Sequence, residues 1–66
     1  MVKQISGRFE DERQNLIEFD IHYDFQNQSV IAYKKIVRNN TTRIQLNQKI
    51  ASRLIKHIRK NRDLYT

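Results

Sequence analysis

Residues 16–25 read LIEFDIHYDF, and an apolar or aromatic side chain occupies every second position of this segment. The apolar series is Ile17, Phe19, Ile21, Tyr23 and Phe25. Charged residues and one histidine fill the positions between them. A period of two is typical of a β-strand that buries one face and exposes the other. The segment therefore predicts a half-buried strand whose solvated face is acidic.

A second strand is expected over residues 29–37, where β-branched and aromatic residues return after a polar break. The two strands form a natural hairpin, but no Asn-Gly or Asp-Gly pair fixes the turn between them. A two-residue turn would place Glu18 opposite Lys35, whereas a three-residue loop would place Ile21 opposite Tyr33. Both registers stay open. Each puts one pair of opposite charges on the polar face, which is a form of internal neutralisation.

The chain on either side of this hairpin supplies the remaining elements. Residues 2–9 form a weaker strand in which Gly7, the only glycine, marks a bulge or a close backbone approach. Residues 43–46 alternate again and predict a short fourth strand. From Asn47, a suitable N-cap, the apolar spacing becomes that of a helix with one buried stripe. That stripe consists of Ile50, Ala51, Leu54, Ile55 and Ile58. The sequence thus predicts one α+β domain over residues 1–66, a small antiparallel sheet of three to four strands packed on a C-terminal amphipathic helix.

Size and composition narrow the setting in which this domain works. A chain of 66 residues buries only about 60% of the surface that its unfolded state exposes, so its core is marginal and we expect a homodimer. It contains no cysteine, which excludes disulfides and Cys-based zinc sites. No signal-peptide run and no long apolar stretch occur, so we expect a cytoplasmic protein without membrane attachment. Its many Ile, Lys and Asn residues indicate AT-rich codons, as in accessory proteins of phages, plasmids and low-GC bacteria.

The charges are divided between the two halves of the chain. Residues 1–33 contain three basic and six acidic residues, while residues 34–66 contain ten and one, so the halves carry formal charges of −3 and +9. Such polarity favours binding to a polyanion or to an oppositely charged protein over catalysis. No P-loop, paired-Cys or HExxH motif is present, and neither histidine has an evident nucleophile or orienting partner. We therefore expect no enzymatic activity, no cofactor and no metal.

Two clusters of polar and basic residues are the candidate nucleic-acid-binding sites. The exposed side of the helix carries Lys49, Arg53, Lys56, Arg59, Lys60 and Arg62. The segment before it carries Lys34, Lys35, Arg38, Asn39, Asn40 and Arg43. No acid occurs between Asp24 and Asp63 to pair with these cations, so their spacing favours contacts with the phosphates of DNA or RNA, with DNA preferred. The alternatives are a solvated or dimer-related helix face and an ordinary polar turn.

The alternative function is a protein-binding module, an inhibitor or adaptor whose basic face docks on an acidic protein. The acidic run at residues 10–12 could in turn dock on a basic partner, including the helix of a second copy, or form a mobile loop. Tyr23, Tyr33 and Phe25 could stack on unpaired bases. Aromatic residues at strand spacing more often belong to the core, with Tyr33 the candidate exception.

Two partial resemblances involve these segments. Residues 42–47, TRIQLN, followed by the helix, resemble the strand and first helix of ribbon-helix-helix repressors, whose paired strands enter the major groove. That match covers at most a third of the chain, which lacks the second helix of the repressor fold. The order of antiparallel strands and one terminal helix, best in residues 16–23 and 44–58, is similar to the transcriptional positive-cofactor family. This resemblance implies dimerisation through the helix and single-stranded DNA on the sheet, although the glycines usual in the family's turns are missing.

Overall fold

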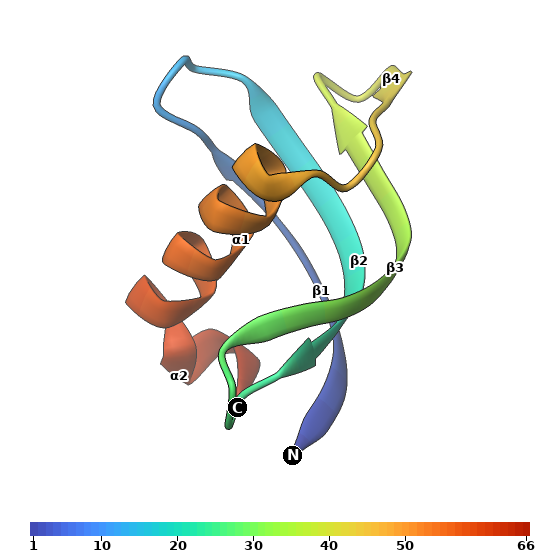
Figure 1. The fold of residues 1–66 in the computed structure, drawn as a ribbon. Coiled ribbons are helices and arrows are strands. Elements are labelled where there is room, and N and C mark those ends of the chain that lie inside the picture. Colours follow the sequence, from blue (N-terminus) through green and yellow to red (C-terminus); the bar gives the residue numbers. More distant parts are fainter.

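The computed structural model describes residues 1–66 and has two layers, a sheet and the helices that cover one of its faces (Figure 1). The sheet has four antiparallel strands in chain order: β1 (Val2–Glu10), β2 (Leu16–Asp24), β3 (Ser29–Arg38) and β4 (Thr42–Arg43). The helical layer consists of α1 (Gln48–Lys60) and the short α2 (Arg62–Tyr65). The predicted α+β class, with an antiparallel sheet and a C-terminal helix, is confirmed. The second helix is an addition to the predicted elements.

The core lies between the sheet and α1. Its nine buried residues are Ile5, Ile17, Phe19, Ile21, Tyr23, Ile36, Ile50, Leu54 and Ile58. Four of them are alternate residues of β2, which is an interior strand with a neighbour on each side. Each large apolar side chain buried in this way contributes about 1.5–3 kcal/mol to folding. The strand predicted from the alternating segment therefore organises the sheet and provides most of its buried face.

The β2–β3 hairpin changes register along its length. Next to the turn, the pairing is that of a two-residue turn, but further along Ile21 pairs with Tyr33, as a three-residue loop would require. Another shift then brings Lys35 opposite Asp20. Each shift inserts one extra residue into β3, and such β-bulges bend a strand and increase its twist. Each predicted register thus holds over only part of the hairpin, and β3 curves along the sheet as Figure 1 shows.

β4 is shorter than predicted and lies slightly earlier in the chain. Instead of residues 43–46, it comprises Thr42–Arg43, which pairs with the end of β3. The intervening turn places Asn39 and Asn40 in the left-handed region, at φ of 54° and 63°. Asparagine tolerates this conformation better than most residues, which explains why the pair can reverse the chain here without glycine.

α1 begins and packs as its sequence pattern indicates. The side chain of Asn47 accepts a hydrogen bond from the backbone N–H of Ile50 at 2.9 Å, so the predicted N-cap is confirmed. Ile50, Leu54 and Ile58 are buried, while Ala51 and the other isoleucine of the stripe are half-buried. No helix of the protein is both long enough and apolar enough to cross a membrane.

Gly7 marks a close approach and not a bulge, because β1 pairs with β2 without any shift in register. A Cβ atom added at Gly7 would lie only 2.6 Å from the hydroxyl oxygen of Tyr65. The missing side chain therefore makes room for Tyr65, which packs the C-terminal end of the chain against the first strand.

Candidate nucleic-acid interface

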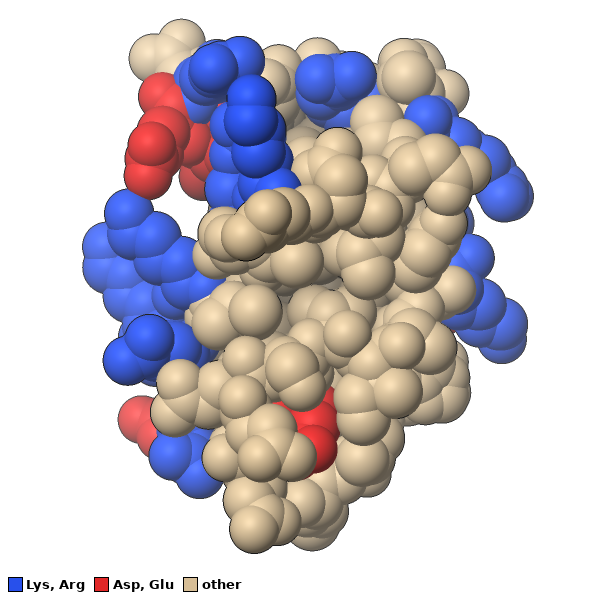
Figure 2. Space-filling model, in the orientation of Figure 1, with Lys and Arg blue, Asp and Glu red and all other residues tan.

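Five basic side chains surround one hollow of about 460 Å³ at the end of the sheet where α1 begins. They come from the β1–β2 loop, β3, β4 and α1, and no acidic residue lines the hollow. We call this site the basic hollow. Its cations are Arg13, Arg38, Arg43, Lys49 and Arg53. Figure 2 shows Lys and Arg side chains gathered at this upper end of the molecule, near the β1–β2 loop and β4.

Arg13 is positioned by the buried carboxylate of Asp11. One oxygen of Asp11 accepts hydrogen bonds from the backbone N–H groups of Arg13 and Asn15, each at 2.9 Å. The other oxygen lies 3.6 Å from Nη1 of Arg53, and the Asp11 side chain is only 1% exposed. Burial by itself raises the pKa of Asp11, but the two backbone N–H groups and the Arg53 guanidinium outweigh it and hold the pKa below its usual value. The ionised carboxylate thus fixes the loop that presents Arg13.

Asn39 holds the β3–β4 turn against the start of β2. Its side-chain oxygen accepts the backbone N–H of Leu16 at 3.0 Å, and its own N–H donates to the Leu16 carbonyl at 2.7 Å. The oxygen that would read a base is therefore engaged within the protein, whereas Asn40 is exposed. Asn39, which was predicted to contact nucleic acid, instead holds the turn next to Arg38 and Arg43. Both arginines are exposed.

The acidic β1–β2 loop lies on the helix of its own chain. Glu12 accepts a hydrogen bond from Nζ of Lys56 at 3.0 Å, next to the contact between Asp11 and Arg53. The hydrogen bond and charge of Lys56 lower the pKa of Glu12. The loop is thus held against α1, and it neutralises part of the middle of the predicted basic stripe. Docking of the acidic run on a second copy stays a prediction.

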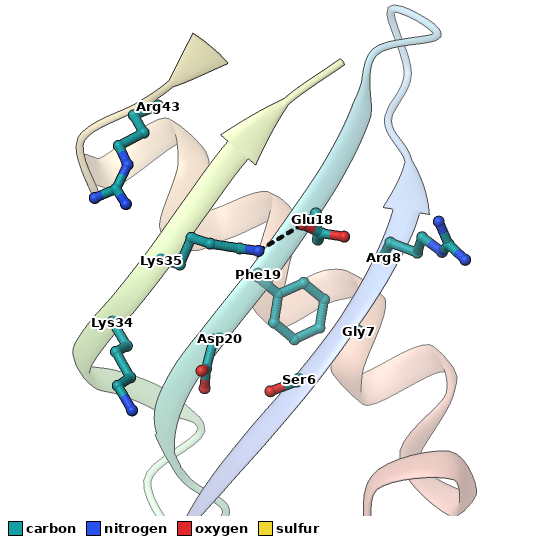
Figure 3. Close-up of a pocket in the computed structure, with 9 residues that line it drawn as sticks. All are labelled: Ser6, Gly7, Arg8, Glu18, Phe19, Asp20, Lys34, Lys35 and Arg43. Carbon is teal, nitrogen blue, oxygen red and sulfur yellow. Dashed lines mark ion pairs between the residues drawn. The ribbon is translucent and has the colours of Figure 1, made fainter. Parts of the chain in front are cut away.

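The sheet face opposite α1 carries a second hollow, of about 590 Å³, in which charges of both signs are mixed (Figure 3). Lys35 reaches from β3 to Glu18 on β2 with an Nζ–Oε1 distance of 2.7 Å. Lys34 and Arg43 line the same hollow, but so does Asp20. Acidic side chains compete with any anion for these cations, so the outer hollow is a poorer phosphate site than the basic hollow despite its larger volume.

The structure therefore divides the predicted site residues into separate groups. Arg38, Arg43, Lys49 and Arg53 meet in the basic hollow, Lys34 and Lys35 lie on the outer sheet face, and Lys56, Arg59, Lys60 and Arg62 lie further along the helices. Arg43 alone lines both hollows. Arg13 is the residue that sequence reasoning missed, because it stands among the acids of the N-terminal half. The chain topology could have indicated it. In an antiparallel meander, the β1–β2 and β3–β4 connections lie at the same end of the sheet.

His57 is used in packing. Its Nε2 is 2.7 Å from the hydroxyl of Tyr65, its Nδ1 is 3.2 Å from the side-chain nitrogen of Asn61, and its ring stacks on Phe9 at 4.4 Å between centroids. Burial lowers the pKa of His57. No group of three or more His, Cys, Asp and Glu side chains is placed to hold a metal ion.

Comparison with known proteins finds no matching protein family, curated protein or solved structure.

Proposed function

We propose that this protein binds nucleic acid without catalysing a reaction, and that phosphates of DNA occupy the basic hollow. The observation that carries the proposal is the convergence of five cations from four segments on a concave surface without acids. Phosphate contacts of this kind gain free energy from the release of counterions condensed on the nucleic acid. Both ring nitrogens of His57 are engaged by neighbouring side chains, which supports a binding role without acid-base chemistry.

The position of the cations favours phosphate binding over a merely solvated surface. Arg38, Arg43 and Lys49 are exposed and form no ion pair within the chain. They are held on a strand end, a second strand and the first turn of α1, so a phosphate would meet a largely preformed arrangement. The N-terminal end of a helix also carries about half a positive charge. Contacts to phosphates position a protein on nucleic acid but carry no base sequence, so binding should depend weakly on sequence.

The experiment is a salt titration with a charge-matched control. Fluorescence anisotropy would measure binding of short duplex DNA, single-stranded DNA and RNA to the natural chain at several salt concentrations. The test variant is Arg43→Gln/Lys49→Gln, and the control is Lys3→Gln/Arg8→Gln, which removes the same charge from exposed positions on β1. Circular dichroism would check that both variants are folded.

For duplex DNA, each lost phosphate contact lowers the slope of log affinity against log salt by about 0.9. The test variant should therefore lose about 1.8 from the slope, while the control loses little. If both variants lost the same amount from the slope, the effect would come from net charge alone. That result would refute the basic hollow as the site. Absence of binding by the natural chain at low salt would refute the function.

A protein partner is the second candidate, favoured by the unpaired edge of β3. β4 pairs only with Val37 and Arg38, so the earlier part of β3 has no strand neighbour on that side. Ile31 is 56% exposed and Tyr33 is 38% exposed in this part. Apolar side chains beside a free strand edge favour the addition of an extended segment from another protein. The lysines that follow them favour acidic residues in that segment.

An alternating valine–glutamate peptide is a suitable probe for this candidate. In a titration followed by amide NMR, the peptide should shift the resonances of residues 30–35, and Ile31→Thr should weaken it. Shifts confined to the basic hollow would contradict strand addition.

The homodimer expected from the small core also stays a prediction. Sedimentation equilibrium should give twice the 8.1 kDa chain mass, and a mass of 8.1 kDa would contradict it.

A further inference from the structure

The hydroxyl of Tyr23 is buried in the core without a hydrogen-bond partner. The residue is 1% exposed, and its ring packs edge-on against Phe25 with 4.9 Å between centroids. Buried hydroxyls are nearly always satisfied by protein, water or ligand, and one left unsatisfied is destabilising. The chain itself thus supplies no partner for this hydroxyl.

Tyr23 also lines a crevice of about 20 Å³ at the end of α1 that lies away from the basic hollow. Its lining is Tyr23, Phe25, Gln28, Ile58, Arg59 and Arg62. A space of this size admits one atom the size of a water oxygen. The two guanidinium groups can only donate hydrogen bonds, and the Tyr23 hydroxyl has its proton to donate. The side chains around the crevice are thus suited to an oxygen that accepts.

The arginines at the crevice are free to hold an anion. Arg59 and Arg62 are exposed and take part in none of the ion pairs within the protein. Asp24, the acid whose charge acts on Tyr23, is engaged elsewhere: its oxygens accept from the backbone N–H groups of Gln26 and Asn27 and from the Asn27 side chain. The C-terminal end of α1 opposes an anion with about half a negative charge, which two full positive charges exceed.

We propose that this crevice binds one phosphate-type oxyanion, of which one oxygen accepts the Tyr23 hydroxyl while Arg59 and Arg62 hold the others at the mouth. Bidentate geometry makes arginine well suited to the outer oxygens. The whole group is too large for the crevice, so only a single oxygen enters it. The ligand is inorganic phosphate or a phosphate group of a nucleotide or oligonucleotide, which share this chemistry. The site is separate from the basic hollow and does not rest on the proposed function.

The test is a titration of the natural chain with inorganic phosphate at constant ionic strength, with chloride as the balancing ion. NMR would follow the side-chain Nε–H groups of Arg59 and Arg62, which should show saturable shifts. Tyr23→Phe should weaken the binding at least about tenfold, as expected for a lost hydrogen bond to a charged group. The matched control is Tyr33→Phe, which removes a hydroxyl elsewhere and should bind phosphate normally.

Stability supplies an independent readout. Without phosphate, Tyr23→Phe should be at least as stable as the natural chain, because it removes an unsatisfied hydroxyl. Phosphate should raise the melting temperature of the natural chain by more than that of Tyr23→Phe or of Arg59→Gln/Arg62→Gln; the two arginines lie at exposed positions. The double arginine variant keeps the test valid if the tyrosine variant does not fold.

Phosphate-independent melting of the natural chain would overturn the proposal and leave water as the partner of Tyr23. Equal phosphate effects in the natural chain and Tyr23→Phe would also overturn it. A short oligonucleotide that reproduces the shifts of Arg59 and Arg62 would identify nucleic acid as a source of the phosphate, whereas a response to inorganic phosphate alone would identify the free ion. Failure of DNA binding in Arg43→Gln/Lys49→Gln bears only on the basic hollow, so the two proposals can fail separately.

Discussion

Gly7→Ala should destabilise the protein by displacing Tyr65. The new Cβ atom would lie 2.6 Å from the Tyr65 hydroxyl oxygen and 3.1 Å from Cζ of Phe19. The Phe19 ring is buried in the core, so Tyr65 has to move instead. Its hydroxyl lies 2.7 Å from Nε2 of His57, and the movement would break that hydrogen bond.

The expected size of the effect follows from three contributions. An extra methyl group in a packed site costs about 1–3 kcal/mol, and a lost hydrogen bond costs about 1 kcal/mol. Alanine is better than glycine in a regular strand by about 0.5–1 kcal/mol, which offsets part of the loss. The net destabilisation should be about 1–3.5 kcal/mol. A domain of this length has only about 3–10 kcal/mol of stability, so the change should be plain in urea denaturation.

A double-mutant cycle tests whether Tyr65 is responsible. In the background of Tyr65→Ala, the shortest contact disappears, and Gly7→Ala should cost at least about 1 kcal/mol less than in the natural chain. The matched control is Ser6→Ala, an exposed neighbour on β1, which should change stability by no more than about 0.5 kcal/mol. Additivity of Gly7→Ala and Tyr65→Ala would refute the close approach as the reason for glycine.

Leu54→Ala should lower the free energy of unfolding by about 2–5 kcal/mol because its side chain is fully buried against the sheet, and a near-neutral result in urea denaturation would contradict that packing. The pKa of His57 lies below its ordinary 6.5 because the ring is buried, so the unfolded state binds more protons and stability should fall as the pH drops below about 6.5. His57 can contribute up to about 1.4 kcal/mol per pH unit to the slope of the free energy of unfolding against pH. Urea denaturation at a series of pH values should show that this contribution vanishes in His57→Gln and persists in His22→Gln. Glu12→Gln should release Lys56 and steepen the salt dependence of DNA affinity by up to about 0.9, whereas an unchanged slope in anisotropy titrations would show that phosphates do not contact the middle of the helix.

The fold could be predicted for segments in which a single hydrophobic pattern determines the secondary structure. The alternation of residues 16–25 and the helical spacing from Asn47 each leave a single way to bury an apolar face. The hairpin register could not be predicted, because it is set by two bulges in β3 that have no residue signature of their own. Predicting one uniform register therefore failed, although Lys35 still reaches Glu18 because a lysine side chain can bridge neighbouring positions across the strands.

The candidate site was harder to predict than the fold, because it joins residues by topology and not by spacing. Counting charge along the chain identified Arg38, Arg43 and Lys49, but placed Arg13 in the acidic half. It also treated the helix cations as unpaired, since no acid stands near them in the sequence. Their partners come from the β1–β2 loop, and only the packing of that loop against α1, with Asp11 beside Arg53, reveals the pairing.

The opposite charges of the two halves of the chain are in part internal neutralisation. Three acids of the N-terminal half pair with three cations of the C-terminal half: Asp11 with Arg53, Glu12 with Lys56, and Glu18 with Lys35. These pairs reduce the positive charge on the middle of α1 and on the outer sheet face, whereas the cations at the two ends of α1 include several without an ion pair. The helix has 13 residues and is about 20 Å long. A polyanion that engages the basic hollow and the Tyr23 crevice together must span this distance, about six phosphates of one duplex strand at 3.4 Å per charge. Shorter anions can occupy only one end at a time, and this separation is what would allow the domain to favour a nucleic-acid chain over free phosphate.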